Sequence, residues 1–435
     1  MISHRTKKIV LYSHDTQGLG HMRRNLAIAS ALINANPNLA ILLITGAGEI
    51  NSFDIPPGID CLTLPALGKQ ADGQYRPRSL SVSLRHLINL RASAIRAAIE
   101  AFAPDAFIVD KLPLGAFDEL KPALEWLRSR PRTRCILGLR EILDEPETAR
   151  REWQAAGSDA AIRAYFDAIW VYGDPRVCNP ITEYGLPDDI AAKVQFTGYL
   201  NRYALCPPTQ AAADPLLARL NLGDHSLALC MVGGGQDGEQ LADAFLQAEL
   251  PANTCGLVIT GPYLPAAAMQ RLQARAAASP HKFVLPFVAH PEIFLQRANS
   301  VITMGGYNSV CETVSFNKPA LIVPRVKPRL EQLIRAKRLA RLNVVSTLHP
   351  ADLTPAALSG WLARQATAAP RAAHNLDLDG LRRIPTLLTD LLAAPPKRAV
   401  NRTTNQKFLS TSHRWLYTQR ESLPTAKEMF NYAYH

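Results

Sequence analysis

Apolar and polar positions follow two different periods along the chain. Short runs that are almost wholly apolar, such as Lys8 to Ser13 (KIVLYS), are separated by longer stretches with apolar residues at helical spacing, such as Arg23 to Ile33. Strands buried on both faces of a parallel sheet have this uniformly apolar character, and the helices between them complete βαβ units. We therefore predict an α/β chain. Its further strands are expected at 40–45, 59–64, 106–109, 135–139, 169–172 and 194–197, then at 227–232, 256–259, 283–285, 301–303 and 320–323.

One segment interrupts this rhythm. Residues 201–224 contain three prolines and a small cluster of alanines, which is typical of a linker. We predict two tandem Rossmann-like domains, at 1–200 and 225–394, which face each other across a cleft and are followed by a basic, aromatic tail at 395–435. In open parallel sheets ligands bind beyond the carboxyl ends of the strands, so candidate chemistry is expected just after strands.

The composition excludes several protein classes. With 435 residues, 47% of them hydrophobic, the chain is long enough for two or three domains and is neither disordered, collagen-like nor a coiled coil. The apolar runs are too short for a membrane span, and the start of the chain lacks the apolar stretch of a signal peptide. None of the seven cysteines forms a CxxC pair, so we expect neither a zinc site nor a disulfide framework. These features predict a cytoplasmic protein.

The net charge of +11 points to an anionic partner. An excess of 48 Lys and Arg over 37 Asp and Glu suits a phosphorylated substrate or an anionic membrane surface, and solvated basic faces are the alternative. A long helix is expected at 80–102. The segment 76–96, which overlaps this helix, contains five arginines and a histidine among leucines. This segment is either a surface that docks on anionic lipid or one solvated face of a core helix. We expect no nucleic-acid partner, because the basic residues are dispersed and no recognition fold is visible.

The first strand ends in the motif DTQGLGH, residues 15–21. Gly18 and Gly20 allow a tight turn and the close approach of a ligand, here on the acceptor side of the cleft, and the following helix start offers free N–H groups to an anion. His21 lies where a general base could reach a ligand in the cleft, although a histidine that only caps or packs is the alternative. The motif is neither a GxGxxG nor a P-loop.

A second glycine-rich loop opens the second half of the chain. Gly233, Gly234, Gly235 and Gln236 follow an apolar run and precede a helical pattern. Three consecutive glycines at such a position form a suitable cradle for a diphosphate, and a flexible turn is the alternative.

The most specific motif is MGGYNSVCE, which also follows an apolar run. Its Gly305 and Gly306, with Asn308 and Ser309 at the start of the next helix, can donate hydrogen bonds to phosphate. Glu312 lies one turn further, where a carboxylate can accept the two hydroxyls of a ribose.

An acid and an amide stand side by side after the next predicted strand. Glu331 and Gln332 together suit the vicinal diol of a sugar, and an exposed helix start is the alternative.

From about Ala228 to Arg341 the segments GGGQDG, LPFV, MGGYNSVCE, KPALIVP and EQ occur in order. In this region the chain resembles the inverting, metal-independent GT-B glycosyltransferases of family 28, which include the N-acetylglucosaminyltransferase of peptidoglycan-precursor synthesis, and GLGH extends the resemblance weakly to the first half. The resemblance implies that 1–200 is the acceptor-side domain and 225–394 the nucleotide-sugar-binding domain. It also implies roles for single residues: the glycine loop at Gly233 to Gln236 and the turn at Gly305 and Gly306 for the donor diphosphate, Phe287 and Val288 for the base, Glu312 for the ribose, and Glu331 with Gln332 for the donor sugar.

The sequence departs from the family in two places. The family pair at the sugar position is usually Gln-Gln or Asp-Gln, whereas this chain has Glu331 and Gln332. The preceding loop, 325–329, is unusually basic and suits a donor phosphate. The donor sugar and the acceptor therefore stay open.

Three residues are candidates for the base that an inverting transfer needs. His21 comes first because its loop faces the cleft in the family, Asp110 second, and Glu141 third; both acids follow predicted strands. The one DxD motif, Asp377 to Asp379, is expected at a loop or helix start, so we predict no metal and no cofactor, with the nucleotide sugar as a substrate.

These inferences combine into one functional hypothesis. We expect transfer of a sugar from a UDP-type donor to an unidentified, lipid-linked or phosphorylated acceptor, by a protein that contacts the inner face of an anionic membrane. A nucleotide-sugar 2-epimerase or hydrolase of the same fold, and a non-catalytic nucleotide-sugar-binding protein, are the alternatives.

Overall fold

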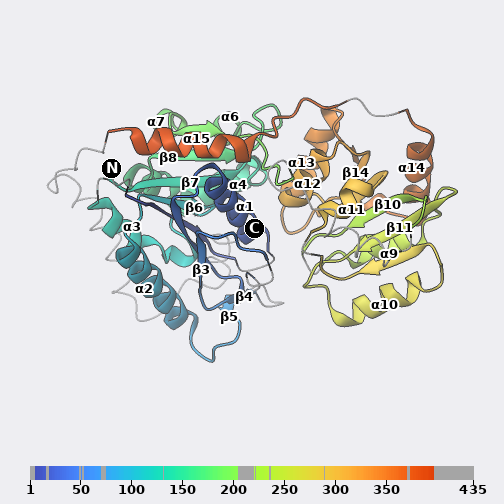
Figure 1. Cartoon of the computed structure of the whole chain (residues 1–435), viewed down its shortest axis with the longest axis horizontal. Helices are drawn as coiled ribbons and strands as arrows, with labels where there is room; N and C mark the ends of the chain where they lie inside the picture. Colours follow the sequence, from blue (N-terminus) through green and yellow to red (C-terminus); the bar gives the residue numbers. More distant parts are fainter. Residues whose placement is uncertain are drawn as a thin grey trace.

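The computed structural model describes residues 5–15, 19–48, 50, 53–69, 75–130, 132–203, 220, 222–234, 237–288, 290–369 and 373–395. Its first half is built on a seven-stranded parallel sheet (Figure 1). In spatial order the strands are β3 (Ile59–Thr63), β2 (Leu39–Thr45), β1 (Lys7–Ser13), β6 (Ala106–Asp110), β7 (Arg134–Arg140), β8 (Ala168–Tyr172) and β9 (Val194–Phe196).

Helices cover both faces of this sheet because its central strands are apolar on both sides. Ile9, Val10, Leu11 and Tyr12 of β1 are all fully buried, and alternate residues enter separate hydrophobic clusters on the two faces. The first-half helices are α1 (Gly20–Ala35), α2 (Leu84–Phe102), α3 (Lys121–Arg128), α4 (Pro146–Ala155), α5 (Ser158–Tyr165), α6 (Pro180–Tyr184) and α7 (Asp188–Ala191), with a 3-10 turn η2 (Ala116–Asp118) and a small antiparallel pair, β4 (Leu67–Lys69) and β5 (Tyr75–Pro77).

The second half repeats this plan with a six-stranded parallel sheet. Its strands lie in the order β12 (Lys282–Leu285), β11 (Thr254–Ile259), β10 (Ser226–Met231), β13 (Ser300–Thr303), β14 (Ala320–Ile322) and β15 (Ser346–Thr347). The helices are α9 (Glu239–Gln247), α10 (Ala266–Ala276), α11 (Glu292–Arg297), α12 (Tyr307–Ser315), α13 (Glu331–Arg341) and α14 (Pro355–Thr367), with a 3-10 turn η3 (Pro350–Asp352). Two Rossmann-like halves are thus present, and the predicted fold class is confirmed.

The last described helix returns to the first half. In Figure 1 the chain passes from α14 back across the top of the molecule, and α15 (Gly380–Ala393) lies over the first sheet. Leu381, Ile384 and Leu388 of α15 are buried in the same cluster as Leu26 of α1. The second domain was predicted at 225–394, but α15, the last helix in that range, packs on the first half. Asp379 directly precedes α15, as expected for a DxD motif at a helix start, although its side chain makes no capping hydrogen bond.

The candidate motifs lie at the point in each sheet where the order of consecutive strands reverses. Neighbouring strands β1 and β6 send their connections to opposite sides, and so do β10 and β13. Such a switch point opens a crevice beyond the carboxyl ends of the strands. His21 and Asp110 lie at the first switch point, and the two glycine-rich loops lie at the second.

One helix is shorter than predicted. The helix expected from residue 80 begins at Leu84, because the Ser83 side chain accepts a hydrogen bond from the backbone N–H of His86 and caps the end. Within the part of the chain that the structure describes, no helix is long and apolar enough to cross a membrane. Most of the predicted linker and nearly all of the predicted tail lie outside the described residues.

Candidate functional site

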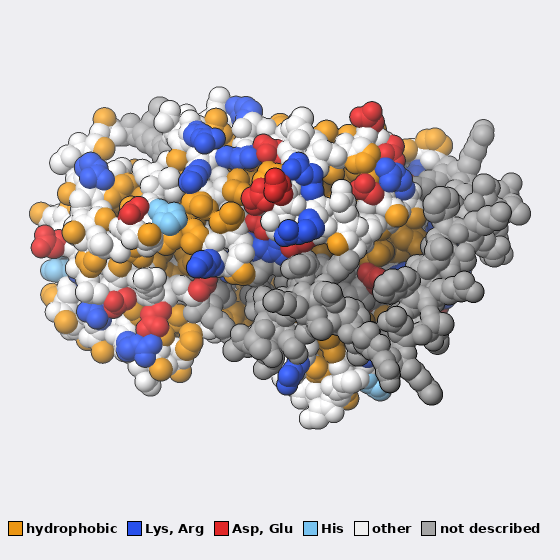
Figure 2. Space-filling model, turned by 180° about the vertical axis from the view of Figure 1, so that it is seen from behind, with side chains coloured by type: hydrophobic (Ala, Val, Ile, Leu, Met, Phe, Trp, Pro, Cys, Tyr) orange, Lys and Arg blue, Asp and Glu red, His pale blue; other side chains and the backbone are white. Residues whose placement is uncertain are grey.

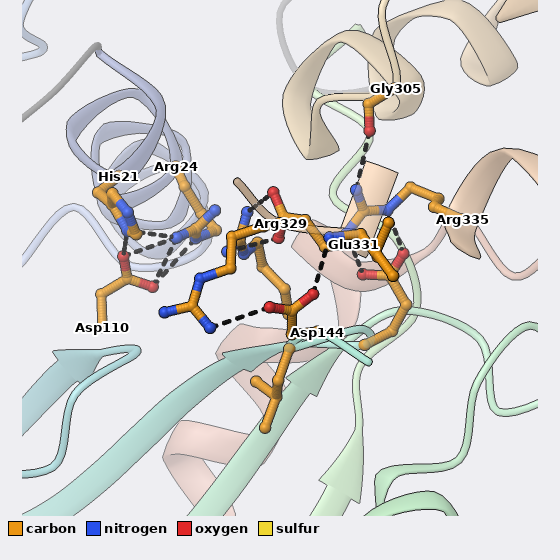
Figure 3. A network of polar contacts seen from close by, with 12 residues as sticks. His21, Arg24, Asp110, Asp144, Gly305, Arg329, Glu331 and Arg335 are labelled. Atoms are coloured by element: carbon orange, nitrogen blue, oxygen red, sulfur yellow. Dashed lines mark hydrogen bonds and ion pairs between the residues drawn. The ribbon is translucent and has the colours of Figure 1, made fainter. Parts of the chain in front are cut away.

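The first two base candidates are in direct contact. His21 lies in the first turn of α1 and Asp110 is the last residue of β6, 89 positions later. Since β1 and β6 pair side by side, the segments that follow them meet at one sheet edge. The His21 Nδ1 atom and the Asp110 Oδ2 atom are hydrogen-bonded (Figure 3). The carboxylate is almost fully buried, while the imidazole remains 15% exposed.

Arg24 completes this cluster from the next turn of α1. Its Nη2 atom donates to both oxygens of Asp110, at 2.8 and 2.6 Å, and its Nε atom lies 3.1 Å from Oδ1. Burial alone would raise the pKa of Asp110, but the charge of Arg24, together with His21, outweighs it and holds that pKa well below its usual range. Asp110 is therefore a carboxylate that accepts hydrogen bonds and does not itself take a proton near neutral pH.

The imidazole of His21 is held in its neutral form. Burial lowers its pKa, and the attraction of Asp110 is partly cancelled by the nearby Arg24. The buried His14 ring lies 4.7 Å from it, centroid to centroid, and burial also lowers the pKa of His14. A neutral imidazole is the form that can accept a proton.

The start of α1, which carries His21, contacts the start of α12 in the second half. Asn308 Nδ2 donates a hydrogen bond of 2.9 Å to the carbonyl oxygen of Gly20. Both residues were predicted for the site, one on the acceptor side and the other beside the donor diphosphate. The candidate base therefore lies close to the start of α12, where free backbone N–H groups can receive an anion.

The two glycine loops of the second half lie next to each other. Gly233 has a φ of +74°, which favours glycine, and a Cβ added there would lie 4.0 Å from the hydroxyl of Ser309. A Cβ on Gly234 or Gly306 would meet no atom within 4 Å, whereas one on Gly305 would lie 2.9 Å from a backbone oxygen. Open space above Gly306 is what a ligand cradle requires. The predicted residues Gly18, Gly235 and Gln236 lie outside the described residues.

Glu312, predicted for the ribose, already has partners from outside its own sheet. It lies on α12, and its carboxylate accepts a hydrogen bond of 2.8 Å from Arg23 of α1. Arg202, just after the first sheet, lies 3.6 Å away. The cavity beside these three side chains has a volume of about 10 Å³, enough for about one water molecule.

Glu331 and Gln332, predicted for the donor sugar, are both buried at the start of α13. Arg140, the last residue of β7, forms an ion pair of 2.8 Å with Glu331. Burial would raise the pKa of Glu331, but Arg140 and other nearby cations lower it to about 2. The Gln332 side chain accepts a hydrogen bond of 3.0 Å from the backbone N–H of Arg325. The exposed helix start considered from the sequence is not what the structure shows.

The third base candidate, Glu141, is enclosed. Its side chain is fully buried and pairs at 2.7 Å with Arg335 of α13, while the Tyr199 hydroxyl donates to it at 3.1 Å. Arg335 also donates at 2.9 Å to the carbonyl oxygen of Gly305 (Figure 3). Through Arg335, Glu141 of the first half is thus linked to the glycine turn of the second half.

Phe287 and Val288, predicted to contact the base of the nucleotide, lie at the edge of the second sheet. The Phe287 ring meets the edge of the Phe53 ring of the first half at 5.8 Å between centroids. Val288 is partly buried against the cluster that contains Phe294. An aromatic ring that reaches across to the first half is consistent with a position beside a cleft.

Both arginines of the basic loop 325–329 are paired, whereas Lys327 is exposed. Arg329 pairs with Asp144 at 2.9 Å and with Glu152, both from the first half (Figure 3). Arg325 lies 3.4 Å from Asp237. Figure 2 likewise shows Lys and Arg side chains next to Asp and Glu side chains near the middle of the face it displays. Much of the basic excess near the cleft is therefore paired.

Lys111 differs from these arginines. It follows Asp110 with a left-handed backbone, φ +70°. Its backbone N–H donates a hydrogen bond of 2.8 Å to the carbonyl oxygen of Gly138, but its side chain makes no hydrogen bond or ion pair with any residue that the structure describes. Burial, together with Arg140 and against the attraction of Glu331, lowers the pKa of Lys111 to about 7.

One predicted surface residue is inside the molecule. Arg91 was counted with the basic face of the helix in 76–96, but its side chain is fully buried and pairs at 2.5 Å with Glu119. A fully buried guanidinium needs a carboxylate partner, which explains the pairing. This part of the basic-surface prediction is wrong.

Arg23, Arg24, Arg140 and Arg335 were missed as site residues. Arg23 and Arg24 follow the motif after Met22. Arg24 stands three positions after His21 on the same helix face, which is the one local signal that could have pointed to it. Among the described residues no group of three or more His, Cys, Asp or Glu side chains is arranged to hold a metal ion.

The chain is similar to known proteins in sequence over one region and in fold over most of its length. Residues 228–376 match the glycosyltransferase family 28 C-terminal domain. No curated protein matches the chain. Similar solved structures are MurG from Acinetobacter baumannii (TM-score 0.52, 16% identity, 88% of this chain and 99% of that one) and MnaA from S. aureus with UDP (0.58, 11%, 90% and 100%). A protein from Listeria monocytogenes assigned as a UDP-N-acetylglucosamine 2-epimerase is also similar (0.57, 14%, 91% and 100%).

Proposed function

We propose that the chain is a glycosyltransferase that moves a sugar from a UDP-linked donor to an acceptor hydroxyl with inversion. The match of residues 228–376 to the glycosyltransferase family 28 C-terminal domain and the similarity in fold to MurG support this proposal. The observation that carries this proposal is the contact of Asn308 with Gly20 beside the His21–Asp110 pair. It brings a candidate base and a candidate diphosphate turn to the same point between the halves. The match to MnaA, whose structure contains UDP, supports UDP as the nucleotide.

In the proposed reaction His21 is the base. Its Nε2 atom takes the proton of the acceptor hydroxyl as the oxygen attacks the anomeric carbon of the donor. The bond from that carbon to the diphosphate oxygen breaks, and UDP leaves with the electron pair. A single displacement of this kind inverts the anomeric centre. Asp110 stays ionised and orients His21.

The departing diphosphate requires stabilisation. In this proposal the backbone N–H groups at the start of α12, with the turns at Gly233 and Gly306, receive its charge, so no metal or cofactor is needed. Glu312 takes the ribose hydroxyls, Phe287 and Val288 contact the base, and Glu331 with Gln332 holds the sugar.

The acceptor is proposed to be lipid-linked or phosphorylated, with the protein at the cytoplasmic face of an anionic membrane. Leu80, Val82 and Leu90 are exposed apolar side chains at or just before α2. Arg85 and His86 lie on the same segment and are also exposed. Apolar side chains beside basic ones suit peripheral contact with anionic headgroups.

Epimerisation or hydrolysis of the nucleotide sugar is the second candidate. It is favoured by the similarity to the Listeria monocytogenes protein, which extends over 91% of this chain. Such an enzyme would use the same donor site but would convert a UDP-sugar without any acceptor.

Release of free nucleotide distinguishes these candidates. The full chain is incubated with UDP-, GDP- and dTDP-sugars, with and without a crude lipid extract as acceptor. Release that depends on the extract supports transfer, and conversion of a UDP-sugar alone supports the second candidate. Calorimetry with UDP provides the binding readout, with Glu312→Ala as the variant expected to lose affinity. UDP binding without any turnover would leave a non-catalytic nucleotide-sugar-binding protein, and absence of UDP binding would overturn both enzyme proposals.

A further inference from the structure

Arg24 is buried at the centre of the site although no motif or comparison assigns it a role. It stands one turn after His21 on α1, and its side chain is 2% exposed. Three of its hydrogen-bond distances, between 2.6 and 3.1 Å, are to the two oxygens of Asp110. Its guanidinium is planar and carries several donors, so it fixes both the position and the plane of the carboxylate.

The geometry at His21 Nδ1 decides which nitrogen carries the hydrogen in the neutral ring. Two groups approach this atom: Asp110 Oδ2, and Arg24 Nη2 at 2.9 Å. Arginine can only donate, and an ionised carboxylate can only accept. Because the Nη2 hydrogens already have the two oxygens of Asp110 as acceptors, Nδ1 must carry the hydrogen and donate it to Asp110. The lone pair is then on Nε2, which makes no hydrogen bond to any residue that the structure describes.

We propose that Arg24 is a positioning residue that acts through Asp110 to keep His21 protonated on Nδ1 and unprotonated on Nε2. This inference rests on the proposed function for its catalytic meaning, since Nε2 is the atom that takes the acceptor proton. The inference about the ring itself stands on the three side chains alone (Figure 3).

Arg24 also limits how strongly Asp110 attracts a second proton to the ring. An isolated carboxylate beside an imidazole favours the imidazolium. Here the guanidinium compensates the carboxylate, so the imidazole stays neutral. The other groups that face the ring from β1 and its loop are His14, which is itself neutral, and Asp15. Asp15 accepts hydrogen bonds from the Met22 N–H at 3.0 Å and the Thr45 hydroxyl at 2.6 Å.

Both halves of the molecule hold Arg24 in place. Its guanidinium lies 5.8 Å from the ring centroid of Tyr172, at the end of β8, and 5.4 Å from that of Tyr307, the first residue of α12. Tyr307 belongs to the turn proposed for the donor diphosphate. The position of α12 therefore affects Arg24, and through it the orientation of Asp110 and His21.

The test is an NMR titration of the full chain with ¹⁵N-labelled histidine, assigned with His21→Gln. In the wild type the ¹⁵N shifts of the neutral ring are expected to report hydrogen on Nδ1. In Arg24→Gln the pKa of His21 is expected to rise by about one unit, a tenfold change in proton affinity, because Asp110 loses its compensating charge. Arg24→Lys keeps the charge but not the bidentate contact, so it should restore most of the wild-type pKa. Arg163→Gln, which breaks an exposed bidentate pair with Asp189, should change nothing.

Hydrogen on Nε2 in the wild-type ring would overturn the proposal, and so would an unchanged pKa of His21 in a folded Arg24→Gln protein. If Arg24→Gln does not fold, the wild-type tautomer still decides, because hydrogen on Nε2 overturns the proposal by itself. These readouts need no substrate. A ring that behaves as expected in a protein without nucleotide-sugar turnover would refute the proposed function and leave the positioning role intact. Once a donor that the protein converts is known, the acid limb of its kcat/KM profile against pH should shift to higher pH in Arg24→Gln, in parallel with the pKa of His21.

Discussion

Arg23 and Glu312 form a hydrogen-bonded ion pair of 2.8 Å that joins helix α1 of the first half to helix α12 of the second. Both side chains are mostly buried, with 16% and 12% of their surface exposed. The carboxylate proposed for the ribose is thus already occupied, and the cavity beside it holds about 10 Å³. Ligand pockets of several hundred Å³ are usual for molecules of a donor's size, on the order of 300–1,000 Å³. Under the proposed function, donor binding requires this pair to separate.

Removal of Arg23 should favour the donor. In Arg23→Ala the Glu312 carboxylate is free, so the dissociation constant for UDP is expected to fall about fivefold, which corresponds to an ion pair of about 1 kcal/mol. Isothermal titration calorimetry measures this. Arg96→Ala, which removes an exposed pair with Glu100 on α2, is the matched control and should leave affinity unchanged. Equal or weaker UDP binding by Arg23→Ala would show that Arg23 does not compete with the nucleotide.

The Glu141–Arg335 pair should be a main support of the arrangement of the two halves. Arg335→Met leaves a fully buried carboxylate without its cation, and losses of about 3–5 kcal/mol in unfolding free energy are usual for such changes. The double variant Glu141→Gln, Arg335→Met removes the stranded charge and should recover part of the loss. Thermal and urea unfolding measure both, with Arg163→Met at an exposed pair as the control. A loss in the single variant no larger than in this control would contradict the assignment.

Lys111 should make stability depend on pH. Its pKa falls from about 10.5 in the unfolded chain to about 7 in the folded protein, so the unfolded chain binds more protons between these values. The contribution of Lys111 to the free energy of unfolding should therefore rise with pH across this window and be constant outside it. Lys111→Met removes the cost of the buried charge, so it should stabilise the protein most below pH 7, and the gain should vanish near pH 10.5. Melting temperatures at pH 6 and pH 10 test this, and equal gains at both would refute it.

The two glycines of the donor turn should respond differently to alanine. A Cβ on Gly305 would lie 2.9 Å from the carbonyl oxygen of Gln332, whereas one on Gly306 would meet nothing within 4 Å. Gly305→Ala is expected to lower the melting temperature. Gly306→Ala should fold as the wild type and lose UDP affinity at least tenfold, since its methyl group would occupy the space proposed for the diphosphate. Unchanged UDP affinity in Gly306→Ala would place the diphosphate elsewhere.

Much of the architecture could be predicted from local patterns. The strands that flank both switch points were placed within one or two residues, because an apolar run is a property of adjacent residues. The glycine turns after β10 and β13 were found for the same reason. The return of α15 onto α1 was not predicted, since an amphipathic helix does not indicate which of two sheets it will cover.

By itself, the sequence determined the two parallel sheets, the strand-end position of His21 and Asp110, and the glycine turns that face them. Only the tertiary structure decided the partner of each charge. Arg24 meets Asp110 across 86 positions, and Arg23 meets Glu312 across 289. The chain has 48 Lys and Arg residues and 37 Asp and Glu residues. No local period links the partners of these two long-range pairs, because electrostatic pairing depends on distance in space and on burial. The packing of the two halves therefore decides which cation pairs with each carboxylate and which nitrogen of the His21 imidazole makes no hydrogen bond within the described residues.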